Sequence, residues 1–100
     1  MAYVSKFKSK INDELFRAIL ALENNEECYK FFEDLMTIKE LQSISQRWAV
    51  ARMLREGKTY HEIETETKAS AATISRINKC LLYGADGYQS MLKKLDKTNK

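Results

Sequence analysis

The sequence predicts an all-α fold of six helices. Apolar residues recur at spacings of three and four along most of the chain, as they do on one face of a helix. The 100 residues include no proline and only three glycines, too few turn-forming residues for an all-β fold. Residue pairs typical of helix N-terminal caps stand before several of the apolar stretches. These patterns predict a single domain over residues 1–100.

The first two helices are predicted over residues 10–23 and 28–36, with Asn24-Asn25 between them. Their large apolar side chains exceed what a chain of this length readily buries by itself. We therefore expect residues 1–36 to form N-terminal dimerisation helices. An intrachain core is the alternative. The apolar residues concerned include Phe16, Leu20, Leu22, Phe31 and Phe32.

A long central helix is predicted over residues 38–56, within a central segment 37–57. Thr37-Ile-Lys-Glu40 matches a capping box, which places a helix start at this point. The apolar stripe that follows stops at Gly57, a residue suited to the left-handed position that ends many helices.

Two shorter helices follow the central one. Thr59-Tyr-His-Glu62 is a second capping box and opens a helix over 60–67. Lys68-Ala69 makes a turn, and Ser70 caps a helix over 71–82. The buried anchors predicted for this pair are Ile63, Ile74, Ile77 and Leu81.

The last helix is predicted over residues 87–95, in a C-terminal segment 86–96. Gly84 ends the preceding helix, and Asp86 can cap the new one. Its predicted apolar face consists of Tyr88, Met91, Leu92 and Leu95.

Residues 59–83 have the sequence shape of a helix-turn-helix, because two short helices are joined by about three residues. Small side chains at the start of the second helix would let it approach a major groove, while hydroxyl and basic groups suit phosphates and base edges. A helical hairpin in an ordinary bundle is the alternative, and the turn has Lys68 where glycine is common. The candidate DNA-contacting residues are Lys68, Ser70, Ala71, Ala72, Ser75, Arg76 and Lys79.

The charge is unevenly distributed along the chain. Residues 11–36 carry seven acidic and two basic side chains, whereas residues 71–100 carry six basic and two acidic ones. A basic C-terminal third suits a phosphate-binding surface, with a solvated lysine-rich tail as the alternative. Glu62, Glu64 and Glu66 would repel phosphate, so we expect at least two of them to face solvent or basic partners.

Several classes of protein are disfavoured. No paired carboxylates or glycine-rich phosphate loop are present, and the chain is not expected to be an enzyme. Cys28 and Cys80 are too far apart for a CxxC motif and are expected to be reduced thiols, with no metal and no required cofactor. No signal peptide or membrane-spanning stretch is evident, which predicts a cytoplasmic protein.

Residues 35–95 resemble the Trp repressor family, in particular its YerC/YecD-like branch. The resemblance implies an intertwined homodimer that binds double-stranded DNA at a palindromic operator through two recognition helices. It also places His61 on the face toward DNA. The strings that carry the resemblance are Leu35-Met-Thr37, Arg47, Leu54-Arg-Glu-Gly57-Lys and Ala72-Thr-Ile-Ser-Arg76.

The same resemblance implies an effector pocket for a tryptophan-like corepressor. It implies that Arg47 and Arg76 bracket an aromatic ring and that Thr73 and Arg76 meet its carboxylate. Leu35 and Thr37 would come from the partner protomer. Two departures count against tryptophan, since Ile77 replaces a glycine and Cys80 replaces the serine that binds the amine. Tryptophan, another small effector and no effector all remain open.

The sequence therefore predicts a sequence-specific DNA-binding transcriptional regulator, with repression favoured, that acts as a homodimer. The alternative is an all-α protein–protein interaction module that docks a partner through its acidic N-terminal helices. Replacing Arg76 and Lys79 would leave the activity of such a module unchanged.

Overall fold

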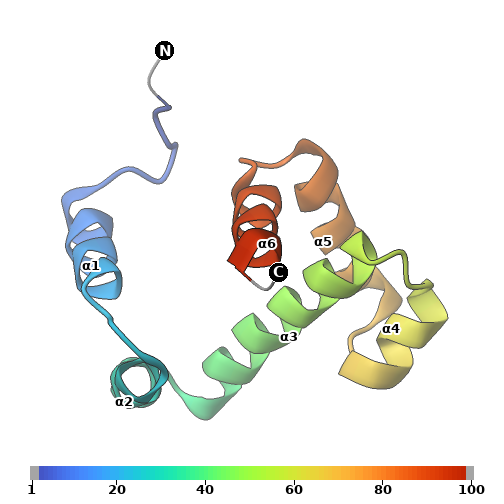
Figure 1. Ribbon diagram of the computed structural model, residues 1–100, viewed down its shortest axis with the longest axis horizontal. Helices are drawn as coiled ribbons and strands as arrows, with labels where there is room; N and C mark the ends of the chain where they lie inside the picture. The colour runs from blue at the N-terminus through green and yellow to red at the C-terminus, as the bar shows by residue number, and fades with distance from the viewer. Residues whose placement is uncertain (1–2, 99–100) are drawn as a thin grey trace. The chain divides into compact units, whose positions relative to one another are not determined.

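The structure, a computed structural model, describes residues 3–98. It contains six helices and, within those residues, no strand, which confirms the predicted all-α fold (Figure 1). None of these helices has the length and hydrophobicity needed to cross a lipid bilayer. The helices are α1 (Lys10–Leu20), α2 (Asn25–Leu35), α3 (Ile38–Arg55), α4 (Tyr60–Thr67), α5 (Ala71–Tyr83) and α6 (Gly87–Thr98).

The chain divides into two compact units, with the boundary between Thr37 and Ile38. The N-terminal unit holds α1 and α2, and the C-terminal unit holds α3 to α6. This boundary lies one residue after residue 36, where the N-terminal helices were predicted to end; their role in dimerisation stays a prediction.

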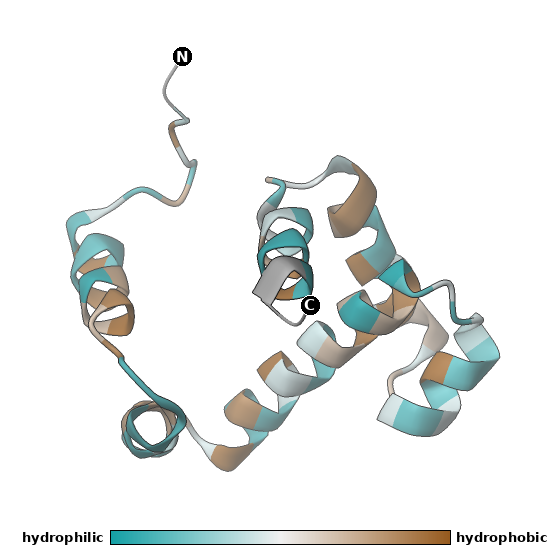
Figure 2. Ribbon diagram, in the orientation of Figure 1, coloured by the Kyte–Doolittle hydropathy of each residue, from teal (hydrophilic) through white to brown (hydrophobic). Residues whose placement is uncertain are grey.

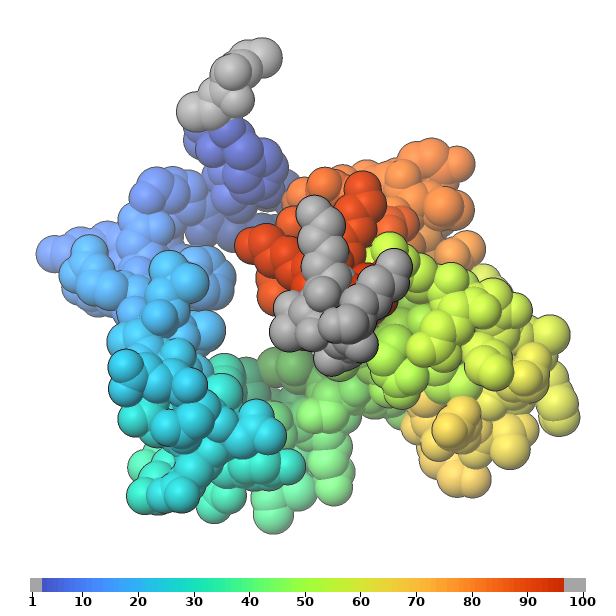
Figure 3. Space-filling view, in the orientation of Figure 1, coloured from blue at the N-terminus to red at the C-terminus, as the bar shows by residue number. Residues whose placement is uncertain are grey.

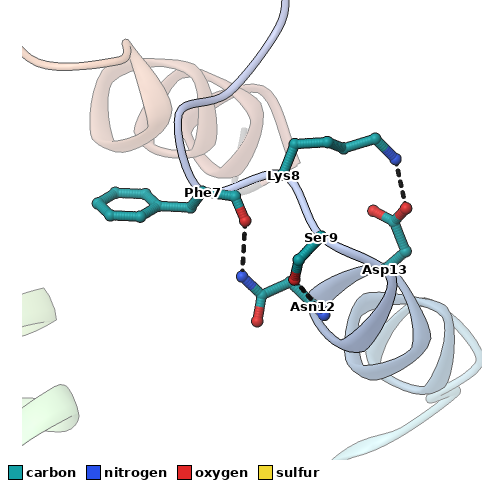
Figure 4. Close-up of polar contacts among 5 residues, drawn as sticks. All are labelled: Phe7, Lys8, Ser9, Asn12 and Asp13. Carbon is teal, nitrogen blue, oxygen red and sulfur yellow. Dashed lines mark hydrogen bonds and ion pairs between the residues drawn. The ribbon is translucent and has the colours of Figure 1, made fainter.

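The N-terminal unit begins with a short turn that is hydrogen-bonded to α1 (Figure 4). Asn12 Nδ2 donates to the Phe7 carbonyl at 2.7 Å, and the Asn12 amide donates to the Ser9 hydroxyl at 3.0 Å. Lys8 forms an ion pair with Asp13. Ser9 is thereby the N-cap of α1, since its oxygen satisfies an amide that has no partner within the helix.

The break between α1 and α2 differs from the prediction. α1 ends at Leu20, so Leu22 lies beyond it, and Asn25 is the first residue of α2 rather than part of a break. The reason is that Asn24 acts as an N-cap, its side chain accepting a hydrogen bond from the Glu27 amide at 2.9 Å.

Neither α1 nor α2 contains a buried residue. Hydrophobic residues lie among hydrophilic ones on α1, as Figure 2 shows, and several of them are largely exposed. Ile11 is 77% exposed and Leu20 is 85% exposed. The unit therefore carries an apolar surface that its own two helices do not cover.

The C-terminal unit contains the core. α3 packs against α4 and α5, α4 packs against α5, and α5 packs against α6. The outer surfaces of α3 and α4 are continuous in the space-filling view (Figure 3). Trp48, Leu54 and Tyr88 pack against the buried residues, which are Val50, Ala51, Met53, Ile63, Ala69, Ile74, Ile77, Leu81 and Leu92.

α3 ends at the predicted glycine. Gly57 has a φ of +85°, and its amide donates to the Leu54 carbonyl at 3.1 Å. The Lys58 amide donates to the Met53 carbonyl at 3.1 Å. These two hydrogen bonds form a Schellman motif, which turns the chain sharply into α4.

α6 is only partly covered by its neighbours. Leu92 is buried and Tyr88 is half-buried, but the predicted apolar residues Met91 and Leu95 are 45% and 41% exposed. The apolar face of α6 is therefore wider than the surface that α3 and α5 offer it. Asp86, predicted to cap this helix, has a positive φ of 71° instead of the extended conformation usual for an N-cap.

Candidate nucleic-acid interface

α4 starts at a capping box, as predicted. The Glu62 amide donates to the Thr59 hydroxyl at 3.1 Å, and the Thr59 amide donates to the Glu62 carboxylate at 3.0 Å. The hydrogen bonds from the Thr59 amide and hydroxyl lower the pKa of the Glu62 carboxyl below its ordinary value. The carboxylate of Glu62 is thus engaged with the start of its own helix.

The turn between α4 and α5 is held by hydrogen bonds from two side chains, Thr67 on α4 and Gln46 on α3. The Thr67 hydroxyl donates to the Ile63 carbonyl at 2.7 Å and accepts from the Ala69 amide at 3.2 Å. Gln46 on α3 donates to the Thr67 carbonyl at 3.1 Å. Lys68 lies in the left-handed conformation, with a φ of 65°, at the turn position where helix-turn-helix motifs commonly have glycine. The central helix therefore holds the turn in place.

α5 begins at Ser70, whose hydroxyl accepts from the Thr73 amide at 3.2 Å. Ile74, Ile77 and Leu81 are buried on the inner side of the helix, as predicted, and Ile63 on α4 is fully buried with them. The first two amides of α5 are left for an external acceptor, because such amides have no partner within the helix. An anion is favoured at this position by the helix dipole.

All eight predicted DNA-contacting side chains are exposed in the structure. Ala72 is exposed and Thr73 is half-buried, so Thr73 rather than Ala72 lies toward the inner side of α5. Glu62 and Glu66 are exposed and Glu64 is half-buried, which agrees with the expectation that at least two acids face solvent. The exposed set is His61, Lys68, Ser70, Ala71, Ala72, Ser75, Arg76 and Lys79. This set contains hydroxyl and basic groups but no carboxylate.

Four of the predicted effector-binding residues line one small cavity. Its volume is about 70 Å³, below the roughly 300 Å³ at which small-molecule pockets begin. Ile77, 5% exposed, belongs to both the core and the wall of this cavity. Leu35 and Thr37 belong to the N-terminal unit, so their part in the site stays a prediction. The lining residues are Arg47, Thr73, Arg76, Ile77, Cys80 and Tyr88.

A second pocket, which is open to solvent and which sequence reasoning missed, lies beside the first. It has a volume of about 450 Å³ and is lined almost entirely by apolar atoms, with Trp48, Tyr88 and Met91 among its residues. The rings of Trp48 and Tyr88 stack with centroids 6.2 Å apart and an interplanar angle of 29°. Tyr88 stands on the apolar face predicted for the last helix, and Trp48 lies within the predicted central helix 38–56. Periodicity alone does not show that these two helices bring the rings together.

The pKa of the Tyr88 hydroxyl, beside both pockets, is shifted mainly by burial. Burial raises this pKa above its ordinary value, and the Cys80 thiol adds to that shift. Arg47 opposes the shift because its positive charge favours the phenolate. The described residues offer no cluster of three or more side chains that would hold a metal ion.

A family model described as Trp repressor protein matches residues 10–96. An uncharacterised protein of Bacillus subtilis, YerC, is 57% identical over 95 residues, which cover 95% of this chain and 91% of that protein. A crystal structure of a candidate Trp repressor from Staphylococcus aureus is 52% identical, with a TM-score of 0.86 and 91% of each chain covered. A TrpR-like protein from Eubacterium eligens is 50% identical, with a TM-score of 0.88, covering 91% of this chain and 94% of that one.

Proposed function

This chain belongs to the Trp repressor family, and from that premise we propose that it is a sequence-specific DNA-binding transcriptional regulator. The observation that carries the proposal is the outer surface of α4, the turn and α5. Residues 68–79 combine hydroxyl groups, three basic side chains and small residues at the start of α5 and include no carboxylate, whereas α4 exposes Glu62 and Glu66. The proposed activity of the protein is DNA binding, with repression of transcription as the favoured outcome.

The proposed contacts follow from the chemistry of the exposed side chains. Ala71 and Ala72 leave room for α5 to approach the edges of bases in a major groove. Ser75 and Arg76 lie on the exposed side of that helix and suit base or phosphate oxygens, while Lys79 suits a phosphate. Ser70 places the amides of the first turn where a phosphate can accept from them.

The proposed regulator acts as a homodimer. The exposed apolar residues of α1 and α2 give a reason, because a second chain would remove this surface from water at roughly 25 cal/mol per Å². A two-fold dimer presents two recognition helices and so reads a palindromic operator, with half-sites about one helical turn apart. Sedimentation equilibrium measures this directly, and a monomer at micromolar concentration would contradict it.

Selection from a pool of host genomic DNA fragments, at two salt concentrations and with or without L-tryptophan, tests the DNA-binding proposal. Enrichment of a few palindromic fragments is expected, with affinity that falls steeply as salt rises. Enrichment of no fragment under any of these conditions would count against a regulator.

A pair of charge-matched variants makes the test specific to the proposed surface. Lys79→Gln removes a basic group from the exposed face of α5, and Lys30→Gln removes one from α2, where it pairs with Glu26. Loss of one phosphate contact per protomer lowers the slope of log affinity against log salt by about 2 for a dimer. Lys30→Gln should leave the slope unchanged.

The interaction-module alternative gives the opposite result. If the chain docks a protein through its acidic N-terminal helices, both variants would bind DNA equally poorly. Equal salt slopes for Lys79→Gln and Lys30→Gln would therefore favour the alternative.

A further inference from the structure

The turn between α4 and α5 contains a residue in an unfavourable backbone conformation. Lys68, the C-cap of α4, has a φ of 65°, in the left-handed region that only glycine adopts without steric cost. Lys68 is exposed and belongs to the predicted DNA-contacting set. Lysine therefore supplies a positive charge at this position but does not ease the turn as glycine would.

Gln46 on the central helix supplies a hydrogen bond to this turn. Thr67 is the last residue of α4, so its carbonyl has no amide partner within the helix. Gln46 Nε2 donates to this carbonyl at 3.1 Å from 21 positions away in the sequence, and both residues are half-buried. The hydrogen bonds of the Thr67 hydroxyl stay within α4 and the turn, whereas the bond from Gln46 joins the turn to α3.

α5 starts directly after this turn. Its N-cap is Ser70, three residues beyond Thr67, and Ala69 between them is 4% exposed. The direction of the first turns of α5 is therefore set where the chain leaves Thr67. Gln46 acts on that point from α3, the helix that contributes three buried residues to the core.

The reading of base edges is sensitive to the direction of α5. Contacts that give specificity must be held to within about 0.5 Å, and short side chains such as those of Ala72 and Ser75 cannot compensate for a shift of the helix. The long side chain of Lys79 can still reach a phosphate after such a shift. A movement of α5 therefore lowers discrimination between sequences before it lowers affinity for DNA of any sequence.

From these observations we propose that Gln46 is a positioning residue for sequence-specific DNA binding. It holds the Thr67 carbonyl and thereby fixes the direction in which α5 leaves the left-handed turn at Lys68. Gln46 lies outside the proposed DNA-contacting set and acts through α5. The inference rests on the proposed function, because α5 is the proposed recognition helix.

Two variants that remove the same chemical group test the proposal. Gln46→Met replaces the amide by a thioether of similar length, so the donor is lost while the packing volume is largely kept. Gln89→Met is the control, because Gln89 is also half-buried and its Nε2 donates to a backbone carbonyl, that of Leu81, at 3.2 Å. The control bond lies toward the opposite end of α5, and we expect similar urea midpoints for the two variants.

Amide hydrogen exchange of the free protein, followed by NMR, tests the hold on the turn without DNA. The Lys68 amide donates to the Glu64 carbonyl at 2.9 Å, and the Ala69 amide donates to the Thr67 hydroxyl at 3.2 Å. Loss of the hydrogen bond in Gln46→Met should speed the exchange of these two amides about three- to tenfold. Gln89→Met should leave both rates unchanged.

Competition binding tests the consequence for DNA. The two probes are a genomic fragment enriched by the wild-type protein and a fragment of equal length and composition with a shuffled sequence. The ratio of the two affinities should fall about three- to tenfold in Gln46→Met, with the salt slope and the affinity for the shuffled fragment unchanged. Gln89→Met should keep the wild-type ratio.

Unchanged exchange of the Lys68 and Ala69 amides in Gln46→Met would overturn the proposal. An equal loss of affinity for both fragments would show that Gln46 stabilises the fold without positioning α5, and an equal fall of the ratio in both variants would remove its special role. If the wild-type protein prefers no fragment, the proposed function fails. Faster exchange in Gln46→Met would then retain the hold on the turn and remove its consequence for DNA.

Discussion

Replacing Ile77 by alanine tests how much its buried side chain, which lies between the core and the small cavity, contributes to the stability of the fold. Its side chain is 5% exposed and belongs to the buried cluster of the C-terminal unit, yet it also lines the cavity between Arg47 and Arg76. The substitution keeps the helix-forming character of the position and removes only buried apolar atoms.

The size of the effect follows from the atoms removed. Isoleucine to alanine deletes three carbon groups, each worth about 0.8 kcal/mol of burial, or about 2.4 kcal/mol in all. Incomplete collapse of the space left behind adds to this, so we expect the free energy of unfolding to fall by about 3 kcal/mol. Leu82→Ala, on the same helix but 61% exposed, should cost less than about 0.5 kcal/mol in the isolated fold.

Urea unfolding followed by Trp48 emission measures the difference, because Trp48 packs against the same cluster. Equal midpoints for Ile77→Ala and Leu82→Ala would refute the burial of Ile77.

Calorimetric titration of the wild-type protein with L-tryptophan measures whether the small cavity binds this ligand. We expect no saturable binding, since about 70 Å³ does not hold an indole ring, and micromolar binding would refute the closure by Ile77.

Three further predictions concern glycine and ionisable groups. Gly57→Ala should destabilise the fold by about 1 kcal/mol, because a φ of +85° strains any L-residue even though no atom lies within 4 Å of the new Cβ; an unchanged melting temperature would contradict this. Glu62 has a depressed pKa in the folded state, so its stabilising contribution is present above the ordinary carboxyl range and is lost as pH falls through the depressed value. Glu62→Gln should therefore flatten the acid side of a melting-temperature profile, and parallel profiles would rule the contribution out. Tyr88 has a raised pKa, so stability should fall as pH rises above the ordinary tyrosine value; Tyr88→Phe should remove that part of the alkaline decline, and an identical decline in both proteins would show that Tyr88 plays no part.

The helices were predictable because their signals are local. The Thr59 and Glu62 capping box, the Ser70 cap and the left-handed Gly57 each depend on residues a few positions apart. Errors arose where two local signals competed. The sequence Asn24-Asn25 is compatible both with a break between helices and with a helix start. In the structure the Glu27 amide donates to the Asn24 side chain, so a helix starts here.

The exposed face of the recognition helix was predictable for a similar reason. Once Ile74, Ile77 and Leu81 are assigned to the inner side, the helical repeat places Ser75, Arg76 and Lys79 on the outer side. The cavities were not predictable in this way. Trp48 and Tyr88 are 40 positions apart in sequence, and no local pattern indicates that their rings stack.

The sequence by itself determined the all-α class, the order of the helices, the caps that begin α4 and α5, and the face of α5 that stays in water. Only the tertiary structure decided that Ile77 fills the wall beside Arg47 and Arg76, and that Met91 and Leu95 remain exposed on α6. The physical reason is the distance along the chain between the residues that interact. Helix caps and amphipathic faces depend on neighbours within a few residues, whereas cavities and covered surfaces depend on how side chains from distant helices share the same space.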